Sequence, residues 1–278
     1  MTTPEPDIAP KKTAPRQPLW KRGILFVDLF LLVVLWHIAA INVDANFLPT
    51  PGAVWASFTD ELALDAEEGE TLANIPEDHL ITHTITSARR LGLSLLLSVA
   101  LAVPLALLTA QIRPLDAVLT PVLTFAYPAP KVVFLPLIIL FLGLGDESRV
   151  FLVTLVLFFQ VFVIVHDAAV QVQPETLESI NSLGANLWHR LRYVYLPVSI
   201  PAVITALKIS TGTAIAVLYI AEGIAGRTGL GYLINFNYNM LNYNRMYAAI
   251  VMISILGLGL FGIFALLERY FTRWQKAN

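Results

Sequence analysis

The 278-residue chain is 56% hydrophobic and only 14% charged, whereas about a quarter of the residues in a soluble domain are charged. A water-soluble fold of this length could not bury so much apolar surface, so the composition excludes a soluble globular protein. The net charge of −2 lacks the basic excess of nucleic-acid-binding proteins, and the absence of cysteine excludes disulfides, thiolate metal sites and cysteine nucleophiles.

Apolar segments recur along the chain and predict an all-α membrane protein with six transmembrane helices. A hydrocarbon core about 30 Å thick needs roughly 20 residues of apolar helix. Runs of this size lie near residues 23–41, 85–110, 115–142, 149–171, 198–221 and 246–268. The first run lacks a small-residue cleavage site after it, so we expect it to stay in the protein as an anchor.

The distribution of basic residues predicts that both termini are cytoplasmic. Lys and Arg are enriched in the cytoplasmic loops and tails of membrane proteins. On one side of the predicted spans lie Lys11, Lys12, Arg16, Lys21, Arg22, Arg113, Arg190, Arg192, Arg269, Arg273 and Lys276. Residues 42–80 lie on the other side and hold nine acidic residues and no Lys or Arg. Residues 1–22 are therefore expected to form a disordered cytoplasmic tail, and residues 271–278 a second, shorter one.

The outer segment, residues 42–80, contains an amphipathic pattern. Val54, Phe58 and Leu62 fall on one face of a helix, which predicts a helix lying on the membrane surface. The acidic run from Asp65 to Glu70 is either a docking surface for a partner protein or a solvated loop. The Asn- and Tyr-rich stretch 235–244 carries the same two interpretations.

The third apolar segment is interrupted at residues 127–131. Pro128 and Pro130 remove helical hydrogen bonds that lipid cannot replace, so this break has to be buried in protein or to face a water-filled cavity. Lys131 beside the break and Glu222 at the outer end of the fifth segment are charges at membrane depth, where burial is costly and charged residues are often functional.

These two charged residues, with Tyr127 and Tyr219 as polar aromatic neighbours, are candidates to line a substrate path. Each charged residue also has a structural alternative. For Lys131, the side chain extends to the membrane interface or pairs with a backbone carbonyl. For Glu222, the side chain caps an outer loop.

A polar segment at residues 174–197 separates the fourth and fifth spans on the cytoplasmic side. Pro174 suits the first position of a helix over 175–183, and Gly184 permits a sharp turn after it. We expect a second short helix through Trp188 and Arg192, ended by Pro197.

The same segment resembles the EAA loop of binding-protein-dependent ABC importer permeases. The loop's pattern is E-A-A, three residues, G, nine residues, I, any residue, L-P. Glu178-Ser179-Ile180, Gly184, Val194 and Leu196-Pro197 occupy these positions. Ser179 and Ile180 depart from the alanines, so packing of the first short helix is expected to differ in detail.

The resemblance extends over roughly residues 80–270, and four further stretches are similar to one branch of this family. They are Phe47–Pro51, Ala129–Pro136, Phe141–Ser148 and Gly229–Ile234. That branch carries taurine, alkanesulfonates, nitrate, bicarbonate and some thiamine precursors. The resemblance therefore implies an importer in the bacterial inner membrane, with an oxyanion as the expected solute and a thiamine precursor or other small organic nutrient as the alternative.

The resemblance also implies the partners. A type I importer fold over residues 81–270 implies a second permease copy, identical or closely related, two cytoplasmic ATPase subunits, and a periplasmic or lipid-anchored binding protein. This chain has no G-x-x-x-x-G-K-[ST] phosphate cradle, so we expect it not to hydrolyse ATP and to hold no cofactor. Its five histidines show no tight metal-ligand spacing and no Ser-His-Asp arrangement can be argued, so we expect neither a metal site nor an enzymatic activity. ATP and Mg²⁺ would be bound by the partner ATPase.

In such an importer the EAA loop sits in a cleft of the ATPase and couples its closure to the membrane helices. The resemblance assigns docking by charge to Glu178, close approach to Gly184 and apolar contact to Trp188. The full coupling set is Glu178, Gly184, Ala185, Trp188, Leu196 and Pro197. The alternatives are that Glu178 is merely solvated and that Trp188 is an interfacial anchor.

A rival function of another class is secondary transport without an ATPase. Transporters of that kind are often built from inverted repeats with matching broken helices. No second copy of the break at 127–131 is visible in the sequence, which favours the importer.

Overall fold

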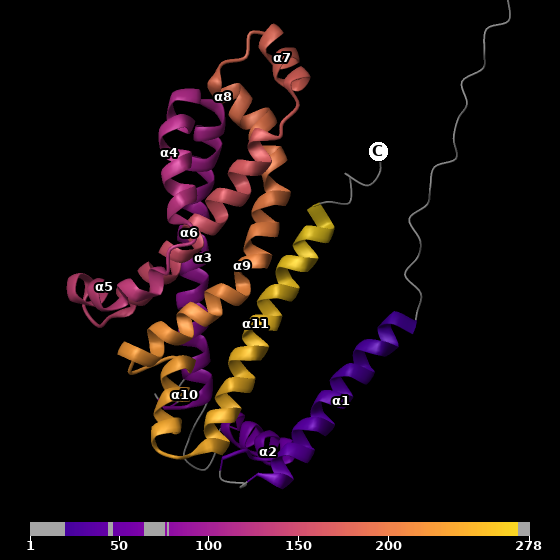
Figure 1. Cartoon of the computed structure of the whole chain (residues 1–278), viewed down its shortest axis with the longest axis vertical. Coiled ribbons are helices and arrows are strands. Elements are labelled where there is room, and N and C mark those ends of the chain that lie inside the picture. Colours follow the sequence, from indigo (N-terminus) through magenta and orange to yellow (C-terminus); the bar gives the residue numbers. More distant parts are fainter. Residues whose placement is uncertain (1–19, 44–46, 64–75, 77, 272–278) are drawn as a thin grey trace, which may run out of the picture. The chain divides into compact units, whose positions relative to one another are not determined.

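The computed structural model describes residues 20–43, 47–63, 76 and 78–271, and every regular element in these ranges is a helix (Figure 1). The chain divides into two parts, residues 1–53 and 54–278, which are described separately. The first part contains α1 (Trp20–Asn42) and the first residues of α2 (Pro51–Leu62). The acidic run predicted at Asp65–Glu70 lies outside the described residues, as do residues 1–19 and 272–278 of the two predicted tails, while residues 20–22 belong to α1 and Phe271 to α11.

The second part contains the rest of α2 and all later helices. In chain order they are α3 (Leu80–Gln111), α4 (Arg113–Ala126), the 3₁₀ helix η1 (Lys131–Phe134), α5 (Leu135–Leu142), α6 (Asp146–Val170), α7 (Pro174–Ser182), α8 (Leu187–Arg190), the π-helix η2 (Leu191–Tyr195), α9 (Leu196–Ala225), α10 (Leu230–Asn239) and α11 (Tyr243–Phe271).

Five of the predicted spans coincide with long or paired helices of this part. Among the described residues, α3, α6, the continuous stretch Leu187–Ile224 and α11 are each long and apolar enough to cross a membrane. The fifth candidate is the pair formed by Arg113–Ala126 and Lys131–Leu142, bent by 86° at the predicted break. The all-α membrane architecture is thus confirmed, and the third span is a broken helix.

The first predicted span, 23–41, corresponds to α1. The apolar stretch that the structure describes within it, Phe30–Asn42, is shorter than a full crossing. The count of six spans and the cytoplasmic position of both termini therefore stay predictions.

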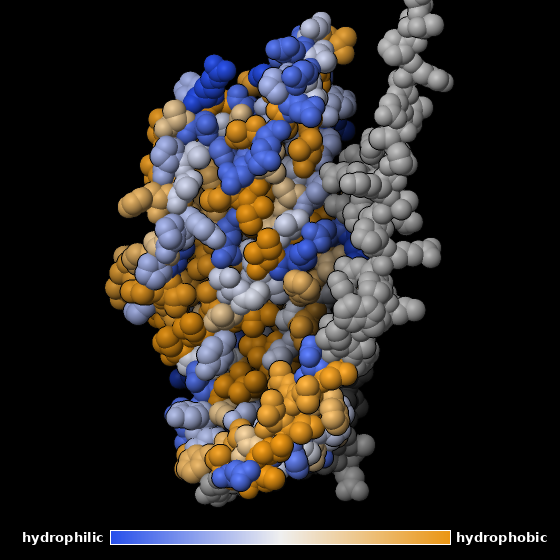
Figure 2. Space-filling model, turned by 45° about the vertical axis from the view of Figure 1, so that its right-hand side comes forward, coloured by the Kyte–Doolittle hydropathy of each residue, from blue (hydrophilic) through white to orange (hydrophobic). Residues whose placement is uncertain are grey.

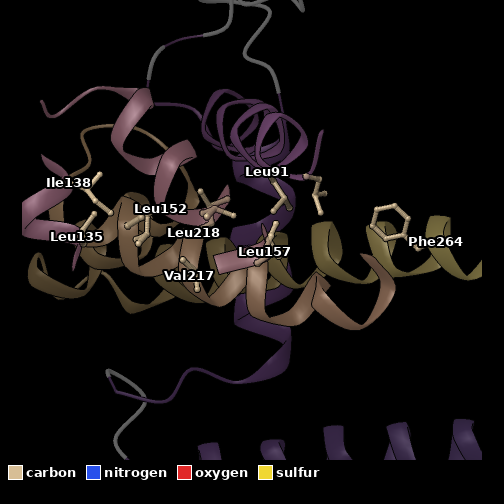
Figure 3. Packing of buried hydrophobic residues seen from close by; sticks show 12 residues of the cluster. Leu91, Leu135, Ile138, Leu152, Leu157, Val217, Leu218 and Phe264 are labelled. Atoms are coloured by element: carbon tan, nitrogen blue, oxygen red, sulfur yellow. The ribbon is translucent and has the colours of Figure 1, made fainter. Parts of the chain in front are cut away.

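The centre of the second part is an apolar core built on α6. Leu152 and Leu157 of α6 are fully buried and pack with Leu91 of α3 and Leu218 of α9 (Figure 3). The opposite faces of these helices remain uncovered, as with Leu96 and other leucines of α3. Figure 2 shows one face of the molecule, on which hydrophobic side chains gather at the left-hand middle and the lower end and more hydrophilic ones towards the upper end. Exposed leucines at this depth are the expected contact with lipid.

The amphipathic helix α2 differs from the sequence-based expectation in what covers its apolar face. Val54 and Phe58 are buried, and Phe58 packs with Leu230 of α10 and Met246 of α11. Glu61, on the polar side, forms an ion pair of 2.8 Å with Arg245. The apolar face is therefore covered by protein, whereas the sequence placed it on the membrane surface. A periodic pattern indicates an apolar face but not what lies against it.

Candidate functional site

The segment predicted to couple to an ATPase stands at one end of the second part, beyond α4 and α9 (Figure 1). Helix α7 begins at Pro174 and carries an exposed Glu178. The chain then reverses at Gly184, whose φ of +78° is a conformation that favours glycine. A Cβ added at Gly184 would meet no atom of this chain within 4 Å. The turn is therefore open to a partner.

The end of this segment differs from the expected short helix closed by a proline. Asn186 caps α8 by accepting a hydrogen bond from the His189 backbone N–H, and the chain then continues without interruption through η2 into α9. In η2 the Leu196 N–H bonds to the Leu191 carbonyl, five residues back. Pro197 thus lies just after η2, within the continuous helical stretch Leu187–Ile224. The proline does not end a short helix.

Trp188 and Ala185 lie between the turn and α9. The Trp188 side chain is 62% exposed and borders a hollow of about 240 Å³. This hollow is lined by Leu108, Gln111, Ile112, Leu187, Trp188 and Leu191. Leu196 is exposed and Ala185 and Pro197 are partly buried, so the predicted coupling residues occupy one continuous stretch with Glu178, Gly184 and Trp188 outermost.

The break in the third span is held together by Lys131. Its side chain is only 7% exposed, and its ammonium donates hydrogen bonds to the carbonyls of Ala126 at 2.7 Å, Tyr127 at 2.7 Å and Ala129 at 3.3 Å. The same ammonium lies 4.3 Å from the ring centre of Phe159 on α6. Lys131 thus satisfies carbonyls that lose their helical donors at the break.

Glu222 lies in the last turn of α9, at the end opposite the coupling segment, and its side chain is 0% exposed. Arg90 of α3, 1% exposed, donates to the Glu222 carboxylate at 2.7 Å and to Asp146 of α6 at 2.6 Å. Ser87 donates to Glu222 at 2.8 Å, and Thr228 accepts from Arg90 at 2.8 Å. Ser87, Arg90, Asp146, Glu222 and Thr228 are called the Arg90 cluster below.

The four predicted path residues do not form one group. Tyr127 is exposed at the break beside Lys131, whereas Tyr219 is partly buried against the α10 and α11 residues around Leu230 and Met246. In this conformation the charged atoms of Lys131 and Glu222 face protein groups, and their role in a solute path stays a prediction.

The comparison with known families matches residues 102–273, more than half of the chain, to the binding-protein-dependent transport system inner membrane component. The chain belongs to this family. It is a permease of an ABC importer, with several apolar helices and a place in the inner membrane. The coupling segment at 174–197 and the break at 127–131 both lie within the matched region.

The permease resembles relatives that differ in the solutes named for them. A riboflavin transport system permease of Chloroflexus aurantiacus is 30% identical over 278 residues, covering 99% of each chain. A taurine transport system permease of Escherichia coli is 27% identical over 263 residues, covering 94% of this chain and 93% of the relative. A formylaminopyrimidine transport permease of Halalkalibacterium halodurans is 23% identical over 247 residues, covering 88% of this chain and 93% of the relative.

The fold of the permease also resembles that of a solved importer. A chain of the MetNI methionine ABC transporter in an inward-facing conformation matches with a TM-score of 0.60 at 20% identity. The match covers 70% of this chain and 96% of that chain. At this identity the likeness shows the fold alone, which is that of a type I ABC importer permease.

Sequence reasoning missed most of the Arg90 cluster in the permease. It singled out Glu222 but none of its partners, although Arg90 lies inside the predicted span 85–110. A charge at membrane depth is the signal that could have found Arg90. Its partner Glu222 is 132 positions away, so no local pattern joins the two.

Proposed function

We propose that this permease forms the translocation path for one small solute, delivered by a separate binding protein and driven by cytoplasmic ATPase subunits. The observation that carries the proposal is the coupling segment, which projects an exposed helix and an open, positive-φ glycine from the end of a long membrane helix. A rigid projection of this kind suits the transmission of movement from a soluble partner.

Within this segment we assign different tasks to the exposed residues. Glu178 supplies a charge for an ATPase cleft, Gly184 allows close backbone approach, and Trp188 adds apolar area. Ala185, Leu196 and Pro197 connect this surface to α9. The family membership supports an ATPase and a binding protein as partners, with ATP held by the ATPase.

The experiment that tests the coupling role compares two charge reversals on α7. Glu178→Lys changes the proposed docking residue, and Glu175→Lys makes the same change one turn earlier at another exposed position. We expect both variants to insert in the membrane. Glu178→Lys should reduce co-purification of the ATPase by at least about tenfold, because reversing one partner of a buried polar contact costs a few kcal/mol.

Equal co-purification of the ATPase with both variants would contradict the assignment of Glu178. Transport by the permease alone, reconstituted without an ATPase, would contradict the importer mechanism itself and favour secondary transport.

The solute is proposed from two sets of observations. The resemblance in sequence to the taurine, sulfonate and nitrate branch favours an oxyanion, and the taurine relative supports this. The riboflavin and formylaminopyrimidine relatives favour an uncharged heterocyclic nutrient instead. The structure adds that the ammonium of Lys131 is already engaged by carbonyls and that Arg90 is already paired with carboxylates.

A single assay separates these two solute classes. The partner binding protein is purified and its thermal unfolding is measured with taurine, nitrate, bicarbonate, riboflavin and formylaminopyrimidine in turn. A specific solute raises the unfolding temperature because it binds only the folded state. A rise with an anion supports the first class, and a rise with a heterocycle supports the second.

A further inference from the structure

Helix α9 connects the coupling segment to the Arg90 cluster. It follows η2 directly, begins at Leu196 and runs for 30 residues, with Glu222 in its last turn. The 30 residues of this helix measure about 45 Å along its axis, which is more than the thickness of the hydrocarbon core, and the axis bends on the way (Figure 1). Helix α9 is therefore a continuous helical connection between the coupling segment and Glu222.

Glu222 binds α10 as well as α3. The backbone N–H of Gly231 donates to its carboxylate at 2.9 Å, and the N–H of Leu230 donates to Ser87 at 2.8 Å while Ser87 donates to Glu222. The N–H of Gly229 donates to His83 of α3 at 3.0 Å. The first residues of α10 are thus hydrogen-bonded to Glu222 or to α3 residues beside it.

The glycines at this junction allow the backbone of α10 to lie in close contact with α9. Gly229 has a φ of +108°, and a Cβ added there would lie 2.3 Å from the Glu222 carboxyl group. A Cβ added at Gly231 would lie 2.5 Å from the Tyr219 carbonyl oxygen. The backbone of α10 therefore fits directly against the last turns of α9.

The charges of the junction are closely paired. Arg90, Arg149 and Glu222 are buried, and Asp146 is partly exposed. Arg89 adds an exposed contact to Asp146, so three cations face two anions. Both oxygens of the buried Glu222 carboxylate accept hydrogen bonds from protein groups, which holds its geometry and leaves no free charge of Glu222 for a solute.

We propose that Glu222 and Arg90 are positioning residues that lock α10 to the outer end of α9, so that the two helices move as one body during transport. The inference rests on the proposed importer function. A displacement of the coupling segment then reaches the outer surface through α9 and repositions α10 and the turn that follows it. The same ion pairs tie α3, through Arg90, and α6, through Asp146, to this end of α9.

The test uses the absence of cysteine in the chain. Spin labels are placed on Ala216→Cys in α9 and Asn239→Cys in α10, both exposed positions, in the complex with its ATPase. The distance distribution is measured without nucleotide and after trapping with ATP and vanadate. In the otherwise unchanged permease we expect the distance between the two labels of one chain to give one narrow distribution that is the same in both states; complexes that carry only the Ala216→Cys or only the Asn239→Cys label identify the distances between two copies of the chain.

The lock is then broken with Glu222→Gln combined with Arg90→Gln, which removes both charges and leaves neither buried alone. We expect the distance to broaden and to change between the two states, and the stimulation of ATPase activity by the binding protein to fall by about tenfold. The milder Ser87→Ala keeps both charges and removes the hydroxyl between Glu222 and Leu230. It should give a smaller change of the same kind, and it carries the test if the double variant does not reach the membrane.

The matched control is the other ion pair of α9, formed by Lys208 with Glu268 of α11. Lys208→Met with Glu268→Gln likewise removes one positive and one negative charge, and it should leave the distribution of label distances narrow. The inference is overturned if the label distance changes between states in the unchanged permease, if breaking the lock has no effect on it, or if the control broadens it equally. Failure of the unchanged permease to bind an ATPase would instead contradict the proposed function.

Discussion

At the scale of single residues, Lys131 shows how a charge at membrane depth can be structural. Its ammonium donates to the carbonyl of Ala126, for which Pro130 has no N–H to offer, and to the carbonyl of Tyr127, whose helical donor, the Lys131 N–H, bonds to Ala129 instead; both distances are 2.7 Å. One side chain therefore allows the third span to bend by 86° without leaving these carbonyls unsatisfied.

Lys131→Met should destabilise the permease. The substitution removes charge-assisted hydrogen bonds to the carbonyls of Ala126 and Tyr127, which costs roughly 1–3 kcal/mol in the free energy of unfolding. Thermal unfolding in detergent, followed by tryptophan fluorescence, should show a lower transition temperature. Arg192→Met, the loss of an exposed cation, is the control and should leave the transition unchanged. Unchanged stability of Lys131→Met together with reduced uptake would instead support the path-lining interpretation.

Gly184 offers a second test at this scale, with Gly143 as the comparison. Their φ values are +78° and +80°, and a Cβ at either position meets nothing within 4 Å. Replacement of Gly184 by alanine should cost about 1 kcal/mol in backbone strain, and replacement of Gly143 should cost more, because its ψ of −176° places it in a region that is almost restricted to glycine. Only Gly184→Ala should also weaken binding of the ATPase, as measured by co-purification. Equal ATPase binding by the two variants would mean that no partner approaches Gly184.

The single residues that sequence reasoning located best are those whose role is local. Pro174 at the start of α7 and the positive φ at Gly184 follow from the conformational limits of proline and glycine. Apart from Glu222, the members of the Arg90 cluster were missed, because they come from three helices and from the loop before α10. Arg90 is 56 residues from Asp146 and 132 from Glu222, and pairing over such distances depends on helix packing.

At the scale of elements, η2 determines the direction in which the coupling segment leaves the membrane. A π-helix holds one more residue per turn than the α-helix on either side of it, so it shifts the register of everything before it. Such a segment carries no sequence signal comparable to apolar periodicity. The sequence therefore located both short helices but wrongly ended the second at Pro197.

Insertion of one alanine after Tyr193, an exposed residue of η2, adds a residue to a turn that already holds an extra one. The coupling segment would then rotate by about 100° relative to α9, because each α-helical residue turns by this angle. We expect normal membrane levels but loss of ATPase stimulation by the binding protein. Tyr193→Ala keeps the length of the chain and should retain stimulation. Stimulation that survives the insertion would show that the register of η2 is unimportant.

The spans themselves were predictable because their signal is composition over about 20 residues. The contacts that these helices make with one another could not be predicted in the same way. The apolar face of α2 was visible in the sequence, yet it lies against α10 and α11, and periodicity does not distinguish protein from membrane as the surface that covers it.

At the scale of the whole molecule, one permease chain carries one coupling segment, whereas an importer of this family is expected to contain two ATPase subunits. We therefore predict two permease chains in the working complex. The mass of the purified complex in detergent should include twice 30.6 kDa of permease, either as two copies of this chain or as one copy with a close relative of similar size. A transport-competent complex with a single permease chain would contradict this.

The Arg90 cluster also has a consequence for the synthesis of the protein. Arg90 enters the membrane with α3, but Asp146 is made 56 residues later and Glu222 132 residues later. At a synthesis rate of about 5–20 residues per second, Asp146 is made roughly 3–11 s after Arg90, and Glu222 roughly 7–26 s after it. A newly made α3 is therefore poorly suited to release into lipid by itself, and insertion of the early helices is completed only when the end of α9 arrives.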